Sequence, residues 1–130
     1  FEIQHFLGMS SLTENTIPSS VITIWNSAFR DCTSLERISF QSCSKLKLIR
    51  NDAFFGCKSL KKLSLPRPLM TVRKYAFRRC SSLVKIEFPI SLINIDPDQF
   101  LECNSLAEVI LPSNISSDFL PQNVKVTLIQ

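Results

Sequence analysis

Cysteine and histidine are the residue types through which this 130-residue chain could do chemistry. The chain holds five cysteines and one histidine, His5. A metal site needs several clustered ligands, and a serine nucleophile needs a histidine held by an acid, so this histidine supports neither. Two glycines leave no material for a phosphate-binding glycine-rich loop. We therefore expect no enzyme, no metal and no cofactor.

Four of the five cysteines recur at regular intervals. Cys32, Cys57, Cys80 and Cys103 are 25, 23 and 23 residues apart, so no Cys-x-x-Cys pair favours zinc. We expect a ladder of small buried thiols. Burial should raise their pKa and make them inert, and the geometry of stacked coils should not fit a disulfide between them. Cys43 lies outside this series, and it is either an exposed reactive thiol or incidental.

The cysteine interval belongs to a repeat that runs through the chain. A phenylalanine stands three residues before each of these cysteines, a leucine stands three residues after it, and an alternating apolar segment follows. Each unit reads Phe-x-x-Cys-x-x-Leu-x-x-Ile-x-Phe-Pro. Such a short unit cannot bury its own apolar side chains, so we expect the units to stack around one shared core. The aligned phenylalanines are Phe6, Phe29, Phe54, Phe77 and Phe100.

Two extended segments are predicted in each unit. The second half of a unit, as in residues 83–88, alternates apolar and polar residues, and Pro89 ends this strand because proline has no N–H to donate. A second apolar pair before each phenylalanine predicts a short strand on the opposite wall. The Ala-Phe stretch between the two strands is expected to form one turn of helix or 3₁₀ helix. The apolar pairs are Val21 and Ile24, Leu46 and Ile49, Leu69 and Val72, and Leu92 and Ile95.

Some units depart from this pattern. Phe1 falls in the slot of Ile24, so the first unit should be truncated, and Met9 should fill the corner that cysteine fills elsewhere. Two extra residues near 41–44 should bulge outward without disturbing the stack. After Pro112 no Ala-Phe or cysteine follows, and residues 124–128 alternate like a last strand. We expect one domain over residues 1–130, with about five repeats and a closing segment at 113–130.

These residues resemble leucine-rich repeats of the BspA type, whose units run Ile-Gly-x-x-Ala-Phe-x-x-Cys-x-x-Leu-x-x-Ile-x-Ile-Pro. The resemblance covers about residues 1–112. It implies a β-rich repeat solenoid, a right-handed coil with a parallel sheet on its concave face and short strands or helical turns on the convex side. It also implies a non-enzymatic binding role at the cell surface or outside the cell, because such repeats are abundant in surface and adhesion proteins. The family glycine is replaced here by Trp25, Arg50, Arg73 and Asp96.

Basic residues are concentrated in the middle of the chain. Residues 45–85 hold twelve of the fifteen Lys and Arg and one acid, Asp52, whereas the segments before and after carry formal charges of −2 and −5. Polar residues beside the central apolar residue of each strand point away from the core, so a charged column from Glu14 to Glu108 should line the concave face. The candidate ligand-binding residues are Arg37, Lys61, Lys62 and Lys85 on this face, and Arg73, Lys74, Arg78 and Arg79 around the turn on the other side.

These bases either solvate a stacked surface or form a site for an acidic partner, such as an acidic protein or a sulfated glycan. Nucleic acid fits less well, because Tyr75 alone is placed to stack on nucleobases and the acidic flanks would repel phosphate. We hypothesise a protein-interaction or adhesion module; the alternative is a run of spacer repeats without a ligand. No apolar stretch approaches the roughly 18 residues of a membrane helix, and the oligomeric state stays open.

Overall fold

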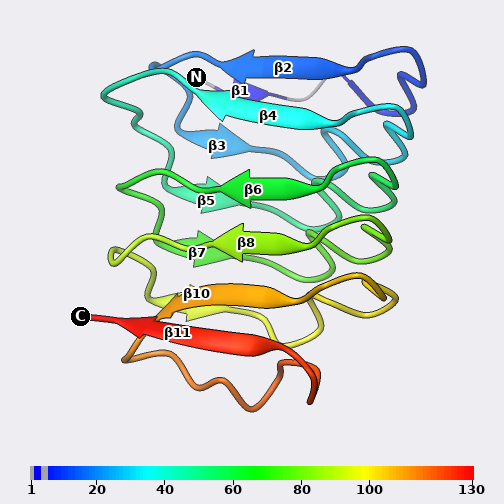
Figure 1. Ribbon diagram of the computed structural model, residues 1–130. Coiled ribbons are helices and arrows are strands. Elements are labelled where there is room, and N and C mark those ends of the chain that lie inside the picture. The colour runs from blue at the N-terminus through cyan, green and yellow to red at the C-terminus, as the bar shows by residue number, and fades with distance from the viewer. Residues whose placement is uncertain (1, 4–5) are drawn as a thin grey trace.

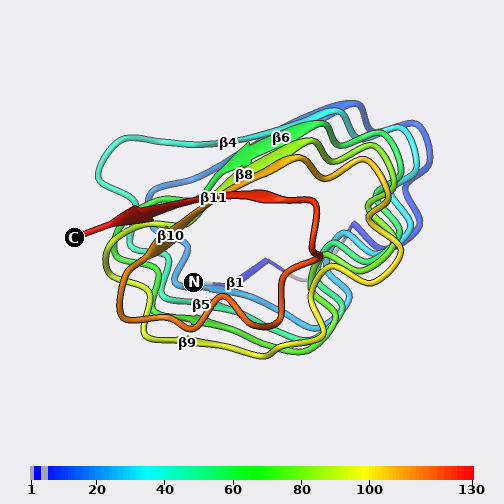
Figure 2. The same cartoon turned by 60° about the horizontal axis from the view of Figure 1, so that its bottom comes forward.

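The computed structural model describes residues 2–3 and 6–130 and shows a β-solenoid, whose successive coils are visible from the side in Figure 1 and along the stack in Figure 2. Each coil except the last places a short strand on one wall and a longer strand on the opposite wall. No described residue lies in a helix. The short-strand wall consists of β1 (Glu2–Ile3), β3 (Thr23–Ile24), β5 (Leu48–Ile49), β7 (Thr71–Val72) and β9 (Asn94–Ile95). The long-strand wall consists of β2 (Glu14–Ile17), β4 (Arg37–Phe40), β6 (Lys62–Ser64), β8 (Lys85–Glu87), β10 (Glu108–Pro112) and β11 (Lys125–Ile129).

All paired strands are parallel, and equivalent repeat positions pair with one another. On the short-strand wall Ile24 pairs with Ile49, and Val72 pairs with Ile95. The inward side chains of both walls form one buried cluster that runs through the stack. The two predicted strands of each unit and the shared core are therefore confirmed, and so is the last strand, because β11 lies parallel to β10.

The first coil differs from the predicted alignment. Ile3, and not Phe1, pairs with Ile24, and its side chain is buried. Phe6 nevertheless remains equivalent to Phe29, because the two rings stack with 5.0 Å between their centroids. The first unit is thus two residues shorter between its short strand and its phenylalanine, a deletion that the phenylalanine spacing does not reveal. Phe1 and His5 themselves lie outside the described residues.

The Ala-Phe stretch forms a series of turns and not the predicted turn of helix. The N–H of Ala28 donates to the carbonyl three residues earlier, whereas the N–H of Phe29 donates to the carbonyl of Ala53 in the next coil, at 2.7 Å. The same alternation continues from residue 27 to residue 32. Ser27 and Asp31 have φ angles of 60° and 58°, which interrupt helical geometry and turn every second N–H toward the neighbouring coil.

Stacked phenylalanine rings fill the core beside these turns. From Phe6 to Phe100 the centroids of neighbouring rings lie 5.0–6.3 Å apart, with interplanar angles of 2–13°. Phe119 extends the stack at 6.1 Å from Phe100, and sequence analysis missed it because it follows Phe100 by 19 residues and not by 23. The prediction for Met9 is wrong. Its side chain is 43% exposed and does not fill the corner that cysteine fills in later coils.

The long-strand wall is divided into two sheets, which the sequence did not predict. β2 pairs with β4, and β6, β8, β10 and β11 form a second sheet, but β4 and β6 do not pair (Figure 1). The division coincides with the two extra residues after β4, where Cys43 is exposed. The break is confined to the long-strand wall, because the short strands β3 and β5 still pair across the same step. The insertion therefore bulges outward but also disturbs one wall of the stack.

Phe77 tests whether the ring stack stabilises the fold. Phe77→Ala removes a fully buried ring that contacts three neighbouring rings, so we expect the free energy of unfolding to fall by about 3–5 kcal/mol in urea titrations. Phe55→Ala is the matched control, because this ring lies outside the stack and is half-buried. Its loss should be about 1 kcal/mol. Equal losses in the two variants would contradict the stacked core.

Candidate functional site

The four recurring cysteines form a hydrogen-bonded ladder inside the solenoid. Each thiol donates to the main-chain carbonyl of the phenylalanine in the preceding coil, as Cys57 does to Phe29 at 3.1 Å and Cys80 does to Phe54 at 3.2 Å. Burial raises the pKa of the Cys57 and Cys80 thiols strongly and raises the pKa of Cys103 to about 11. All described cysteines are free thiols. The ladder is structural, since a protonated buried thiol is a poor nucleophile.

Thiol labelling checks this assignment. A water-soluble disulfide reagent at pH 8 should modify Cys43 in the folded protein, because its side chain is exposed. The buried thiols Cys32, Cys57, Cys80 and Cys103 should react only as the protein unfolds. Modification of more than one thiol per molecule under native conditions would contradict the buried ladder.

Alkaline pH should weaken the fold through the same thiols. The folded-state pKa of Cys57 and Cys80 lies above the unfolded value of about 8.5, so their stabilising effect is complete below that pH and falls as pH rises. We expect the free energy of unfolding to drop by about 1 kcal/mol per buried thiol between pH 8 and pH 9.5. Cys57→Ala should reduce this pH dependence, and an unchanged slope would contradict the explanation.

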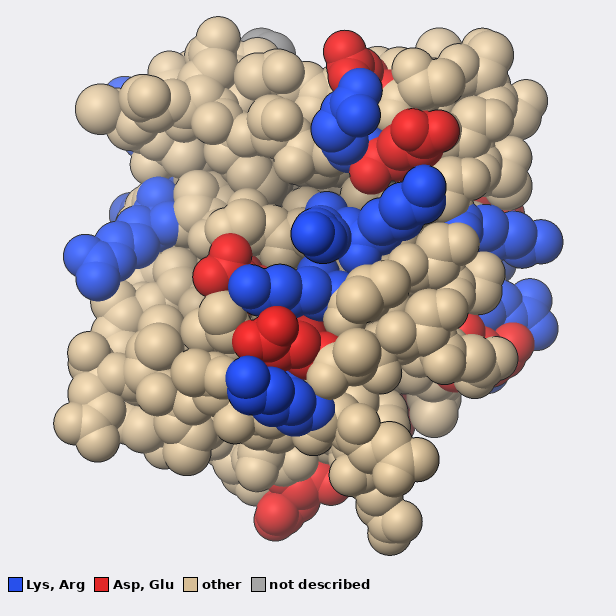
Figure 3. All heavy atoms as spheres, in the orientation of Figure 1, with Lys and Arg blue, Asp and Glu red and all other residues tan. Residues whose placement is uncertain are grey.

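A groove lies on the long-strand wall where β4 and β6 separate. Its volume is about 390 Å³, and its floor includes the buried side chains of Ile38 and Leu63. Figure 3 shows this wall, where Lys and Arg mix with Asp and Glu in a stripe down its middle. Three of the predicted residues, Arg37, Lys62 and Lys85, line this groove. Ser39, Ser64 and Glu87 complete its polar lining.

The cations of the groove differ in their partners. Arg37 pairs with Glu14 on the neighbouring strand at 2.6 Å, and Lys85 lies 3.9 Å from Glu108 on the other side. Lys62, between them, forms no ion pair with any acid in the described part of the chain. The two ion pairs draw their cations toward the ends of the stack, so Lys62 is the ammonium group that a ligand can reach without breaking an ion pair.

The second predicted group is divided between two places. Arg78 and Arg79 both contact the carboxylate of Glu102, at 3.4 Å and 2.9 Å, and the hydrogen bond from Arg79 lowers the pKa of that acid. Arg73 and Lys74 instead line a separate open pocket of about 330 Å³ together with Arg50, Asn51 and Asp96. The second predicted basic group is thus partly neutralised, because one acid pairs with two of its four cations. Lys61 is exposed but does not line the groove.

The sequence analysis placed Glu14 and Glu108 in one column with the bases of the long-strand wall, but it did not predict the ion pairs. Each of the pairs Glu14 with Arg37, Arg79 with Glu102 and Lys85 with Glu108 is separated by 23 residues, one repeat. Opposite charges one repeat apart were therefore a readable signal. Aromatic partners of the bases were not predicted either. The Arg50 guanidinium, for example, lies 4.1 Å from the centroid of the Trp25 ring.

Two comparisons with known proteins agree with this geometry. The sequence pattern described as "BspA type Leucine rich repeat region" matches residues 2–119 in six copies. The chain belongs to the BspA-type leucine-rich-repeat family. This assignment confirms the resemblance and the solenoid, and leucine-rich-repeat proteins of this kind generally mediate protein interactions. The matched region ends at Phe119, the last ring of the stack.

Solved structures of other leucine-rich-repeat proteins resemble this chain. A crystal structure of a leucine-rich-repeat protein from T. pallidum is 32% identical, with a TM-score of 0.87, over 98% of this chain and 61% of that one. A leucine-rich-repeat protein from Bacteroides ovatus ATCC 8483 is 26% identical, with a TM-score of 0.55, over 92% of this chain and 43% of that one. This BspA-type chain therefore spans less than two thirds of either relative. No curated protein matches it.

The described residues contain no helix with the length and apolar character to cross a bilayer. Among the same residues, no group of three or more metal-binding side chains comes together.

Proposed function

We propose that this BspA-type chain is a non-enzymatic binding module that receives an acidic ligand on its long-strand wall. The observation that carries the proposal is Lys62, which has no ion-pair partner among the described acids and lies in the groove between two further cations. The ligand classes with matching chemistry are an acidic segment of a protein and a sulfated glycan. Because proteins with this repeat are abundant at cell surfaces, we place the module at the surface or outside the cell.

The groove favours an anion for three physical reasons. Three cations line the groove against one acid, Glu87, and only Lys62 among these cations is without an ion pair in the described chain. The hydroxyl groups of Ser39 and Ser64 can donate hydrogen bonds to a carboxylate or sulfate oxygen. The apolar floor of Ile38 lowers the local dielectric, which strengthens these interactions relative to an open surface.

Retention on immobilised heparin, eluted with a salt gradient, tests the proposal. Lys61→Gln/Lys62→Gln removes two charges at the long-strand wall, and Arg73→Gln/Lys74→Gln removes two from the second basic group. We expect the first variant to bind about 3- to 10-fold more weakly and the second to elute close to the parent protein. Both variants should unfold within about 0.5 kcal/mol of the parent protein, because all four side chains are exposed.

Each other outcome has a definite meaning. Equal losses in the two variants would show that net charge and not the groove governs binding. If the parent protein elutes below physiological salt from heparin and binds no poly-glutamate in solution, the acidic-ligand proposal fails and spacer repeats become the better account. Binding of poly-glutamate without retention on heparin would assign the ligand to the acidic proteins.

A further inference from the structure

The sixth coil lacks the short strand that each earlier coil contains. Phe100 follows Pro89 by eleven residues, whereas Phe119 follows Pro112 by seven. The positions of Leu92 and Ile115 correspond, since the N–H of each donates to the carbonyl of the proline three residues earlier. The four missing residues are therefore the counterparts of residues 93–96, which contain β9. The segment that follows Ile115 proceeds directly into the turn before Phe119.

This deletion leaves the outer edge of β9 without its usual partner. The carbonyl of Met70, directly before β7, accepts the N–H of Ile93 at 2.9 Å, and the carbonyl of Val72 on β7 accepts the N–H of Asp96 at 3.0 Å. The equivalent carbonyls of Ile93 and Ile95 accept no backbone N–H from the described chain. An unpaired strand edge of this kind is a template for an added parallel strand.

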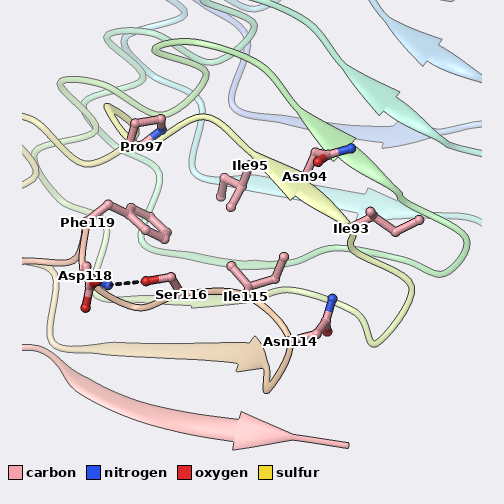
Figure 4. Close-up of a pocket in the computed structure, with 9 residues that line it drawn as sticks. All are labelled: Ile93, Asn94, Ile95, Pro97, Asn114, Ile115, Ser116, Asp118 and Phe119. Carbon is pink, nitrogen blue, oxygen red and sulfur yellow. Dashed lines mark hydrogen bonds between the residues drawn. The ribbon is translucent and has the colours of Figure 1, made fainter.

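A pocket lies where the missing strand would run. Its volume is about 530 Å³, and Figure 4 shows Ile95 on β9 facing Ile115 and Phe119 across the gap. The segment below β9 does not close the gap, because it bonds within itself: the N–H of Asp118 donates to the hydroxyl of Ser116 at 3.3 Å. The walls are thus apolar toward the core and offer free backbone acceptors at the edge.

The charges around the pocket select a basic occupant. Asp118 lines the pocket, Asp96 directly follows β9, and neither forms an ion pair within the described chain. The residues that follow two neighbouring short strands can contact each other, since the Arg50 guanidinium lies over the Trp25 ring of the preceding coil. An added strand would therefore bring the residue after its apolar side chain next to Asp96, where Lys or Arg complements the carboxylate.

We propose that β9 and the pocket beside it form a second docking site, which takes an extended segment of a partner protein as a parallel strand. The segment has an apolar β-branched residue, which covers Ile95 and Phe119, followed by Lys or Arg, which pairs with Asp96. This site is on the wall opposite the basic groove, and it does not depend on the acidic-ligand proposal.

A peptide that copies Leu69–Lys74 is the probe, because this segment has the required order Thr-Val-Arg and forms a short strand in the same wall. Added to the isotope-labelled 130-residue chain, it should cause saturable NMR shifts at residues 93–96 and 115–119. A control peptide with Asp and Glu in place of its Val and Arg should bind at least about tenfold more weakly. Asp96→Asn removes the carboxylate without adding a cation beside Arg73 and Lys74, and it should weaken the native peptide by about 3-fold. The absence of saturable shifts with the native peptide overturns the proposal.

An insertion variant supplies the matched control. Placing Met-Thr-Val-Arg between Ile115 and Ser116 restores the length of the earlier coils, so the chain's own strand should occupy the site. We expect the peptide to lose binding by at least about tenfold and the Tm to rise by about 4 °C or more. Undiminished peptide binding by this variant would overturn the proposal. A parent protein that sediments as a dimer, with the insertion variant a monomer, would assign the edge to a second copy and so refute the partner segment.

Discussion

The backbone N–H and C=O groups at the side of each coil can be satisfied only by the next coil, and the rest of the structure depends on this constraint. It applies to the strands, where Ile24 pairs with Ile49, and equally to the turns, where Phe29 donates to Ala53. Because a buried polar group without a partner destabilises the fold, each unit must repeat the backbone path of its neighbour. The residue types follow from that path. Phenylalanine rings stack, and small thiols reach the phenylalanine carbonyls.

Both candidate sites lie where this stacking is interrupted. The groove opens where β4 and β6 fail to pair, and the pocket beside β9 opens where four residues are missing from the last coil. An uninterrupted solenoid presents flat walls of paired strands, which offer a ligand only side chains. At each interruption a groove or pocket forms, and at β9 backbone carbonyls are also left without a donor from the described chain. Departures from the repeat thus locate candidate function in this protein better than the repeat itself does.

Stacking also decides which charges are available to a ligand. Residues one repeat apart become neighbours on adjacent strands, so Arg37 lies against Glu14 and Arg79 lies against Glu102. Some bases from the middle of the sequence are consequently neutralised by an acid of the neighbouring coil, whereas others are not. Lys62 stands out because it forms no ion pair in the described part of the chain, whereas Arg37 and Lys85 beside it each do. A count of charges along the sequence cannot separate these cases, whereas a comparison at the repeat interval can.

The sequence by itself determined the repeat, the two strands of each unit, the buried thiols and the family, because a 23-residue period leaves few ways to bury Phe54 and Cys57 together. It located the insertion and the exposed Cys43, and it placed Arg37, Lys62 and Lys85 on one face. Only the tertiary structure decided that Ile3 aligns with Ile24, that Phe119 continues the ring stack, and that the long-strand wall divides. The physical reason is that strand pairing and ring stacking act between coils. When a unit is longer or shorter than its neighbour, its own residues do not specify which of them will pair or stack with the next coil.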